Sequence, residues 1–246
     1  MLFLETPTNP GLDVVDLSEA HAFAERNGLI LNVDNCFATP YLQQPAKFGT
    51  QIITHSATKF IDGQGRVMGG VVCGTKELIA EVRKFCRSTG PSLSPFNAWV
   101  LSKSLETLAI RMDRHCLNAE KLAAQLEKNA QIQQVIYPFL PSHPNFQVAK
   151  KQMKKGGGLV AFEIKGGVEA GRKFLDSLQM LSLSANLGDT RSIATHPAST
   201  THAKLTPEAR AAASITEGLI RISVGLEDID DILGDVLGAL GNTDLS

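Results

Sequence analysis

Residues 51–60 have the sequence QIITHSATKF, a short apolar run that ends beside a lysine. The run predicts a strand that enters the protein interior. Lys59 follows it with Ser56 and Thr58 alongside, and residues 63–70 then contain four glycines. Because lysine is normally found at the solvated surface, a lysine at the end of a buried strand is a candidate functional residue.

A second predicted strand, LILNV at residues 29–33, ends directly before Asp34. Its nearly continuous apolar character is typical of a strand buried on both faces of a parallel sheet. In open α/β sheets, ligands bind outside the carboxyl ends of the strands. Asp34 and Lys59 are therefore expected to meet at one ligand, and a structural ion pair is the alternative.

The first part of the chain alternates predicted strands and helices, which indicates an α/β layered domain. A long helical stretch from Ser94 to about residue 129 follows, and we expect it to bend as it enters a second, smaller α/β unit. The boundary is predicted near residue 105, giving units 1–104 and 105–246. Besides 29–33, the expected strands are 2–5, 51–55, 69–74, 132–138, 156–167 and 219–225, and the other helices 16–28, 76–86, 168–178 and 227–240.

Composition excludes several classes of protein. The 24 basic and 25 acidic residues give a formal net charge of −1, and no basic stripe predicts nucleic-acid binding. No apolar run is long enough for a membrane span, and the first residues do not resemble a secretory signal. A cytoplasmic protein is expected. The four cysteines lack metal or disulfide spacing, so we expect reduced, mostly buried thiols and no metal site.

The residue types around Lys59 match the needs of pyridoxal 5'-phosphate (PLP). This cofactor needs a lysine that forms an imine, an acid that pairs with the ring nitrogen, and hydroxyls that hold a phosphate. The glycines at 63–70 leave nucleotide binding as a weaker alternative, because their spacing fits neither GxGxxG nor a P-loop.

Five segments, in chain order, resemble the Cys/Met-metabolism family of fold-type I PLP enzymes. They are ETPTNP (5–10), VDNCFATPYLQQP (33–45), HSATKF (55–60), SPFNAWVLSKSLETL (94–108) and LIRISVGLED (219–228). The resemblance implies an α/β fold made of the C-terminal part of the large PLP-binding domain and a smaller C-terminal α/β domain.

The resemblance also implies roles for individual residues around the cofactor. Lys59 would be the catalytic, Schiff-base lysine, and Asp34 would pair with the pyridinium nitrogen. Ser56 and Thr58 would bind the phosphate. Asn9 would contact the phenolic oxygen of the cofactor.

For the substrate, the resemblance implies that Arg221 binds the α-carboxylate, with Asn186 on the carboxylate side. The strand pattern supports the first role, because Arg221 lies on the face opposite Ile220 and Ile222 and needs a partner there. A structural salt bridge is the alternative. Residues 195–202, THPASTTH, resemble a loop near the substrate entrance.

Within the family, three segments together resemble the O-succinylhomoserine sulfhydrylases: Gln64-Gly65-Arg66, STGPSLSPFNAWVL (88–101) and KKQMKKGGGLVAFEI (150–164). The implied reaction replaces succinate at the γ-carbon with sulfide and gives homocysteine for methionine biosynthesis. Cystathionine γ-synthase and the γ-lyases remain alternatives, because the residues named above do not select the nucleophile. Full-length relatives of this kind are expected to be homotetramers with shared sites.

The family's chains normally begin well before ETPTNP, so this chain resembles one that is N-terminally truncated. The absent part would carry a glycine-led phosphate loop and a tyrosine that stacks on the cofactor. We expect exposed sheet edge and apolar surface as a result. The alternative of another class is a non-catalytic remnant that keeps these residues without turnover.

Overall fold

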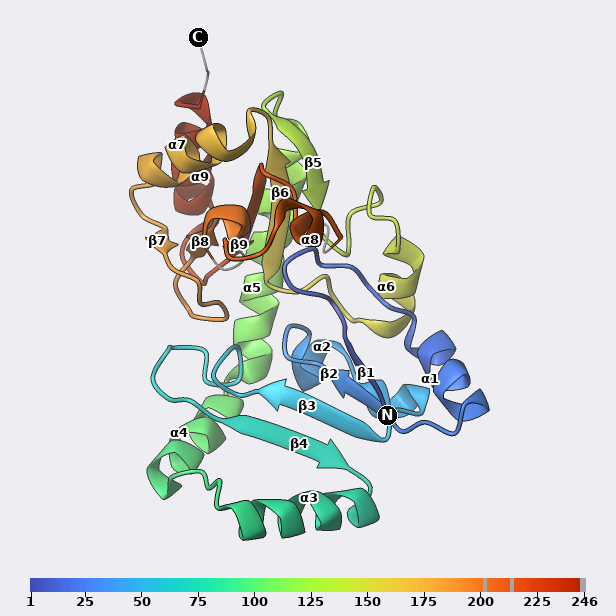
Figure 1. Cartoon of the computed structure of the whole chain (residues 1–246). Helices are drawn as coiled ribbons and strands as arrows, with labels where there is room; N and C mark the ends of the chain where they lie inside the picture. The colour runs from blue at the N-terminus through green and yellow to red at the C-terminus, as the bar shows by residue number, and fades with distance from the viewer. Residues whose placement is uncertain (201–202, 213–214, 244–246) are drawn as a thin grey trace.

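A computed structural model describes residues 1–200, 203–212 and 215–243 and contains two sheets that two consecutive helices connect (Figure 1). Residues 201–202 of the predicted entrance loop lie outside the described residues. The N-terminus lies beside the first sheet, and the chain then passes upward in Figure 1 into the second unit. This α/β architecture is the predicted fold class.

The first sheet has four strands in the order β1-β2-β3-β4. β1, β2 and β3 are parallel, whereas β4 is antiparallel to β3. Parallel pairing brings the carboxyl ends of three strands to one edge, as the ligand-binding prediction requires. The strands are β1 Leu2–Glu5, β2 Leu31–Asp34, β3 Ile52–Ser56 and β4 Gly70–Gly74.

Helix α1, Leu17–Arg26, begins where the sequence predicts. The Asp16 carboxylate accepts hydrogen bonds from the amides of Ser18 and Glu19, at 2.7 and 3.2 Å, and so caps the helix. The apolar face of α1 packs against β2 in a small core. The buried residues of this core are Leu17, Ala20, Ala24, Leu31 and Val33.

Two helices connect the sheets, as the predicted bend requires. α4 is Pro95–Leu105 and α5 is Leu108–Leu126. The Ser94 hydroxyl caps α4 by accepting a hydrogen bond from the Asn97 amide at 3.3 Å. α5 crosses from the first sheet to the second and buries ten of its residues, which contribute to two of the hydrophobic core clusters.

The second sheet has five strands in the order β5-β6-β9-β8-β7, of which only β7 and β8 pair in parallel. Its largest core cluster combines strands with α5, α7 and α9. The strands are β5 Ile132–Ile136, β6 Leu159–Ile164, β7 Ser182–Leu183, β8 Ile193–Thr195 and β9 Leu219–Ser223; the two helices after α5 in this cluster are α7 Gly167–Ser177 and α9 Ile229–Gly241.

The remaining elements are short helices and one amphipathic helix. They are α2 Thr39–Leu42, η1 Pro45–Phe48, α3 Lys76–Thr89, α6 Phe146–Gln152, η2 Pro197–Ser199 and α8 Pro207–Ala212. None of the helices in the described part of the chain combines the length and apolarity needed to cross a membrane.

A buried amide network joins α6 to the first sheet. The Gln152 carboxamide accepts from the Leu17 amide at 3.1 Å and donates to the Val15 carbonyl and to Gln43 Oε1 at 2.9 and 3.0 Å. Gln43 donates in turn to Asn35 Oδ1 at 2.8 Å. All three carboxamides are buried, so their hydrogen bonds must be satisfied within the protein. These bonds therefore determine the position in which α6 packs beside the first sheet.

One region has exposed apolar surface, as the sequence predicts. Every residue of β4 is exposed, and α3 buries none of its residues. Phe85, Phe96 and Trp99, on α3 and α4, are 66%, 64% and 59% exposed.

Replacing Gln152 by alanine tests the amide network. We expect the free energy of unfolding to fall by about 2–4 kcal/mol, because the Leu17 amide and the Val15 carbonyl lose their partner in a buried place. Urea denaturation measures the change. Gln133→Ala, at an exposed position on β5, is the matched control and should change stability by less than about 0.5 kcal/mol. Equal effects of the two substitutions would contradict the role of Gln152.

Candidate active site

The carboxyl ends of β1, β2 and β3 form one edge, and each carries a polar residue. In the parallel register, Glu5 lies opposite Asp34, and Asp34 lies opposite Thr54 near the end of β3. The backbone amide of Asn9 donates to the Glu5 carboxylate at 3.0 Å. The β1–β2–β3 edge therefore gathers two carboxylates and the loop that carries Asn9.

Lys59 lies on the turn that follows β3. Its amide donates to the Ser56 carbonyl at 3.2 Å, and its carbonyl accepts from the Gly63 amide at 2.8 Å. The side chain extends to the second unit, where Nζ donates to Asn186 Oδ1 at 2.6 Å. Partial burial lowers the pKa of Lys59; the Cys36 thiol opposes this, and the positive charge of Arg221 lowers the pKa further.

Arg221 comes from the centre of β9 and is 2% exposed. Its Nη1 donates to Asn9 Oδ1 at 2.7 Å, and its Nη2 donates to the carbonyls of Ala185 and Asn186 at 3.2 and 3.3 Å. Burial lowers its pKa to about 10, with the negative charge of Glu5 acting in the opposite direction. Among the described residues, the buried Nε of Arg221 has no hydrogen-bond partner.

Four of the seven residues predicted for the site thus form one chain of contacts. Lys59 contacts Asn186, the Asn186 backbone contacts Arg221, and Arg221 contacts Asn9. Lys59 and Asn9 lie in the part of the chain before α4, and Asn186 and Arg221 lie in the part after α5. The site is therefore built from segments more than 200 positions apart in the sequence, joined through a buried guanidinium.

Asp34 lies at the same edge, where its Oδ1 accepts a hydrogen bond from the Cys36 amide at 2.9 Å. The pKa of the Cys36 thiol depends on the charges around it. Burial, and then the negative charge of Asp34, raise the pKa of the Cys36 thiol to about 12, whereas the positive charge of Lys59 opposes the increase. The carboxylate and the amine therefore both lie within electrostatic range of one buried thiol.

The two predicted phosphate ligands have different surroundings. Ser56 is half-buried at the end of β3. The Thr58 hydroxyl instead accepts from the Gly69 amide at 3.1 Å and donates to the Gly69 carbonyl at 3.3 Å. A phosphate contact from Thr58 would have to replace its bond to the Gly69 carbonyl.

Sequence reasoning missed two residues of this site. Glu5 ends β1 as Asp34 ends β2, so the same strand-end rule could have found it. Burial raises the pKa of Glu5; a hydrogen bond from Asn9 opposes this, and the charge of Asp34 adds to it. Gly188 packs against the Lys59 backbone with a φ of +76°, and no short motif marks it.

The residues present fit PLP as a bound group. A half-buried amine with a lowered pKa suits a carbonyl partner, and a carboxylate lies at the neighbouring strand end. The unpartnered Nε of Arg221 provides a buried donor for the carboxylate of an amino acid. The donor set therefore offers positions for the cofactor and for a substrate.

Comparison with known proteins gives a consistent result. The chain is 49% identical over 240 residues to an O-succinylhomoserine sulfhydrylase of Pseudomonas aeruginosa, covering 98% of this chain and 60% of that protein. It is 45% identical to an L-methionine gamma-lyase of Pseudomonas putida, covering 98% and 61%. The chain thus spans about 60% of the length of the curated relatives that it matches.

Solved structures agree. A cystathionine gamma synthase from Xanthomonas oryzae pv. oryzae, in complex with cystathionine, superposes with a TM-score of 0.95 at 39% identity, covering 98% of this chain and 62% of that one. A cystathione gamma lyase, CalE6, from Micromonospora echinospora gives 0.93 at 37% identity, covering 97% and 63%. The model of the family described as "Cys/Met metabolism PLP-dependent enzyme" matches residues 1–241. The chain belongs to this family.

Proposed function

We propose that this chain carries the lysine and the substrate-binding arginine of a PLP-dependent enzyme of sulfur amino-acid metabolism, with O-succinylhomoserine and sulfide as substrates and homocysteine as product. The contact chain from Lys59 through Asn186 and Arg221 to Asn9 supports the proposal, because it brings together a half-buried amine and a buried guanidinium, the two groups that these roles require. The proposal includes units 1–104 and 105–246, a cytoplasmic location and a homotetramer with shared sites.

PLP, when bound, would act as an electron sink that stabilises negative charge on the carbons of the amino acid. Lys59 would hold its aldehyde carbon, and Asp34 would keep its ring nitrogen protonated. Ser56 and Thr58 would hold its phosphate, and Asn9 would lie beside its phenolic oxygen.

The substrate would bind with its α-carboxylate at the guanidinium of Arg221. The fork of the guanidinium matches a carboxylate, and Nε has no partner to give up. Asn186 would donate a hydrogen bond to the same carboxylate from its side-chain nitrogen, Nδ2. The α-carbon would then lie near Nζ of Lys59, because Asn186 already contacts that atom.

Lys59 would move the protons. Burial and the charge of Arg221 lower its pKa, so a larger fraction of the amine is neutral near pH 7 than for an exposed lysine. The neutral amine would take a proton from the α-carbon and pass it to the bound cofactor, which makes the amine neutral again. It could then take a proton from the β-carbon and return protons after sulfide has replaced succinate.

The nucleophile distinguishes this proposal from its alternatives. The 45% identity to an L-methionine gamma-lyase supports an elimination that gives an α-keto acid as the second candidate. Assays with and without sulfide separate the two, since sulfide-dependent homocysteine identifies the replacement reaction. Formation of cystathionine from added cysteine would identify a cystathionine γ-synthase.

Lys59→Ala tests the role of the lysine. After incubation with PLP and desalting, the unmodified chain should retain a visible absorption band, and Lys59→Ala should lose it because the variant lacks the amine proposed to bind the aldehyde carbon. Lys121→Ala, at an exposed position of α5, is the control and should keep the band. A band of equal intensity in Lys59→Ala would reject the assignment.

Arg221→Lys tests substrate binding. A lysine keeps the charge but loses the planar fork, so the dissociation constant for O-succinylhomoserine should rise about 10- to 100-fold. Titration of the visible band with substrate measures it. Arg172→Lys, exposed on α7, should leave it unchanged, and an unchanged constant in Arg221→Lys would exclude the carboxylate contact.

A further inference from the structure

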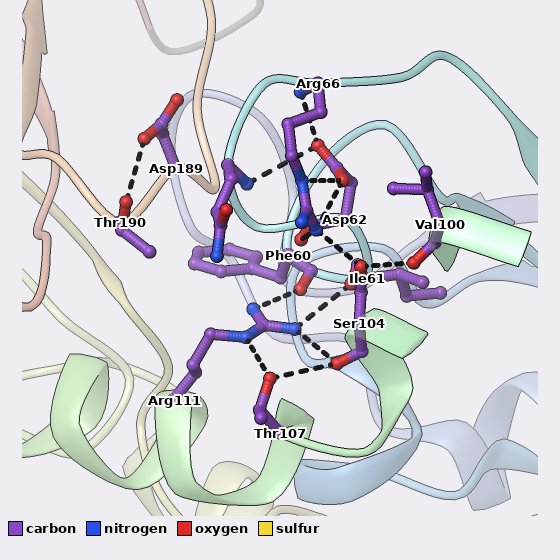
Figure 2. A network of polar contacts seen from close by, with 11 residues as sticks. Phe60, Ile61, Asp62, Arg66, Val100, Ser104, Thr107, Arg111, Asp189 and Thr190 are labelled. Carbon is purple, nitrogen blue, oxygen red and sulfur yellow. Dashed lines mark hydrogen bonds and ion pairs between the residues drawn. The ribbon is translucent and has the colours of Figure 1, made fainter. Parts of the chain in front are cut away.

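The turn of residues 57–63, which carries Lys59, is supported by an arginine that the proposed chemistry does not use. Within the turn, the amides of Asp62 and Gly63 donate to the carbonyls of Ala57 and Lys59 at 2.9 and 2.8 Å. The carbonyls of Phe60 and Ile61 face α5 instead, as Figure 2 shows. Both residues are buried, so these carbonyls need a donor from outside the turn.

Arg111 of α5 supplies that donor (Figure 2). Its Nη1 donates to the Phe60 carbonyl at 2.6 Å and its Nη2 to the Ile61 carbonyl at 3.1 Å. The same guanidinium contacts the junction of α4 and α5, through the Ser104 carbonyl at 3.1 Å and the Thr107 hydroxyl at 3.2 Å. One rigid, buried fork therefore holds the Lys59 turn against the helix junction.

The packing leaves Arg111 little freedom. Gly63 has a φ of +72°, and a β-carbon at that position would overlap Nη1 of Arg111. The guanidinium can lie flat against the turn only because position 63 has no side chain.

A second arginine supports the far end of the turn. The fully buried Asp62 carboxylate accepts from the Arg66 amide at 2.7 Å and from Arg66 Nε at 3.1 Å. Arg66 also donates to the Ser104 hydroxyl at 2.6 Å. Ser104 thus accepts hydrogen bonds from both arginines, from Arg111 at its carbonyl and from Arg66 at its hydroxyl (Figure 2).

On the opposite side, the turn is closed by the loop that carries Asn186. The Thr190 amide donates to the Gly63 carbonyl at 2.8 Å. A β-carbon at Gly188 would lie 2.7 Å from the Phe60 nitrogen and 2.9 Å from the Lys59 carbonyl carbon. The backbone of Lys59 is therefore confined between this loop and Arg111.

We infer that Arg111 is a positioning residue that directs the Lys59 amine into the active site by holding the Phe60 and Ile61 carbonyls, an inference that rests on the role proposed for Lys59. Removing the guanidinium frees two carbonyls on the residues that directly follow Lys59. The turn then has an alternative arrangement in which Nζ leaves Asn186. Small displacements of a reacting group lower its reactivity strongly.

The experiment measures the reactivity of Lys59 in the full chain without relying on turnover. The chain is incubated with PLP over a range of pH, reduced with borohydride and digested, and the label on Lys59 is quantified by mass spectrometry. Lys121, exposed on α5, provides the internal reference for unassisted labelling. The variants are Arg111→Met, Arg111→Lys and the control Arg114→Met, which alters an exposed arginine on the same helix.

We expect the ratio of Lys59 to Lys121 labelling to fall about tenfold or more in Arg111→Met, with its pH midpoint shifted upward. Arg114→Met should retain the unmodified ratio. A purely structural role would change the melting temperature and leave the ratio and midpoint of the folded variant unchanged.

An Arg111→Met chain that folds and labels Lys59 with the unmodified ratio and midpoint overturns the inference. If Arg111→Met does not fold, Arg111→Lys decides: a lowered ratio supports the inference and an unchanged ratio overturns it. Absence of Lys59 labelling in the unmodified chain rejects the proposed role of Lys59 and the inference with it. That outcome is distinguishable because it appears before any variant is compared.

Discussion

The backbone of Gly188 lies against the backbone of Lys59, and the site depends on this contact. It requires a left-handed φ of +76° and no side chain at position 188. The contact brings the Asn186 loop onto the strand-end turn of the first sheet. Lys59 can then reach Asn186, and Arg221 can reach Asn9, so that one amine and one guanidinium from different units meet.

Two positive groups held this closely need compensation. Burial lowers the pKa of Arg221 to about 10, and the negative charge of Glu5 opposes that decrease. Partial burial also lowers the pKa of Lys59; the Cys36 thiol opposes this, and Arg221 lowers the pKa further. The same repulsion that disfavours two adjacent cations thus keeps the lysine closer to its neutral, reactive form. Chemistry and stability make opposing demands on this pair.

Much of the fold could be predicted from the sequence because local rules specify it. Asp16 has the spacing of a helix cap, and the apolar runs before Asp34 and Lys59 have the pattern of buried strands. The two-residue β7 and three-residue β8 were not predicted, since strands so short have no periodicity. The antiparallel direction of β4 was likewise not predicted, because direction depends on the connection in space.

The residues of the site also fall into two groups, those that the sequence predicts and those that it does not. Strand-end position predicts Asp34 and Lys59, and it could also have identified Glu5. Arg111 could not have been found, because an arginine on a helix is usually solvated and its function here comes from carbonyls 50 and 51 positions earlier in the chain. Contacts between distant segments leave no trace in a single sequence.

The pKa of the Lys59 ε-amine, obtained by NMR titration of the chain with ¹³C-labelled lysine, tests most directly whether this amine is half-buried beside Arg221. We predict a pKa below the ordinary 10.5, because of burial and the neighbouring charge of Arg221, and an increase in Arg221→Gln, which removes that charge. A Lys59 that titrates at the ordinary value and is unaffected by Arg221→Gln would contradict it, since the amine would then lie in solvent, away from the guanidinium.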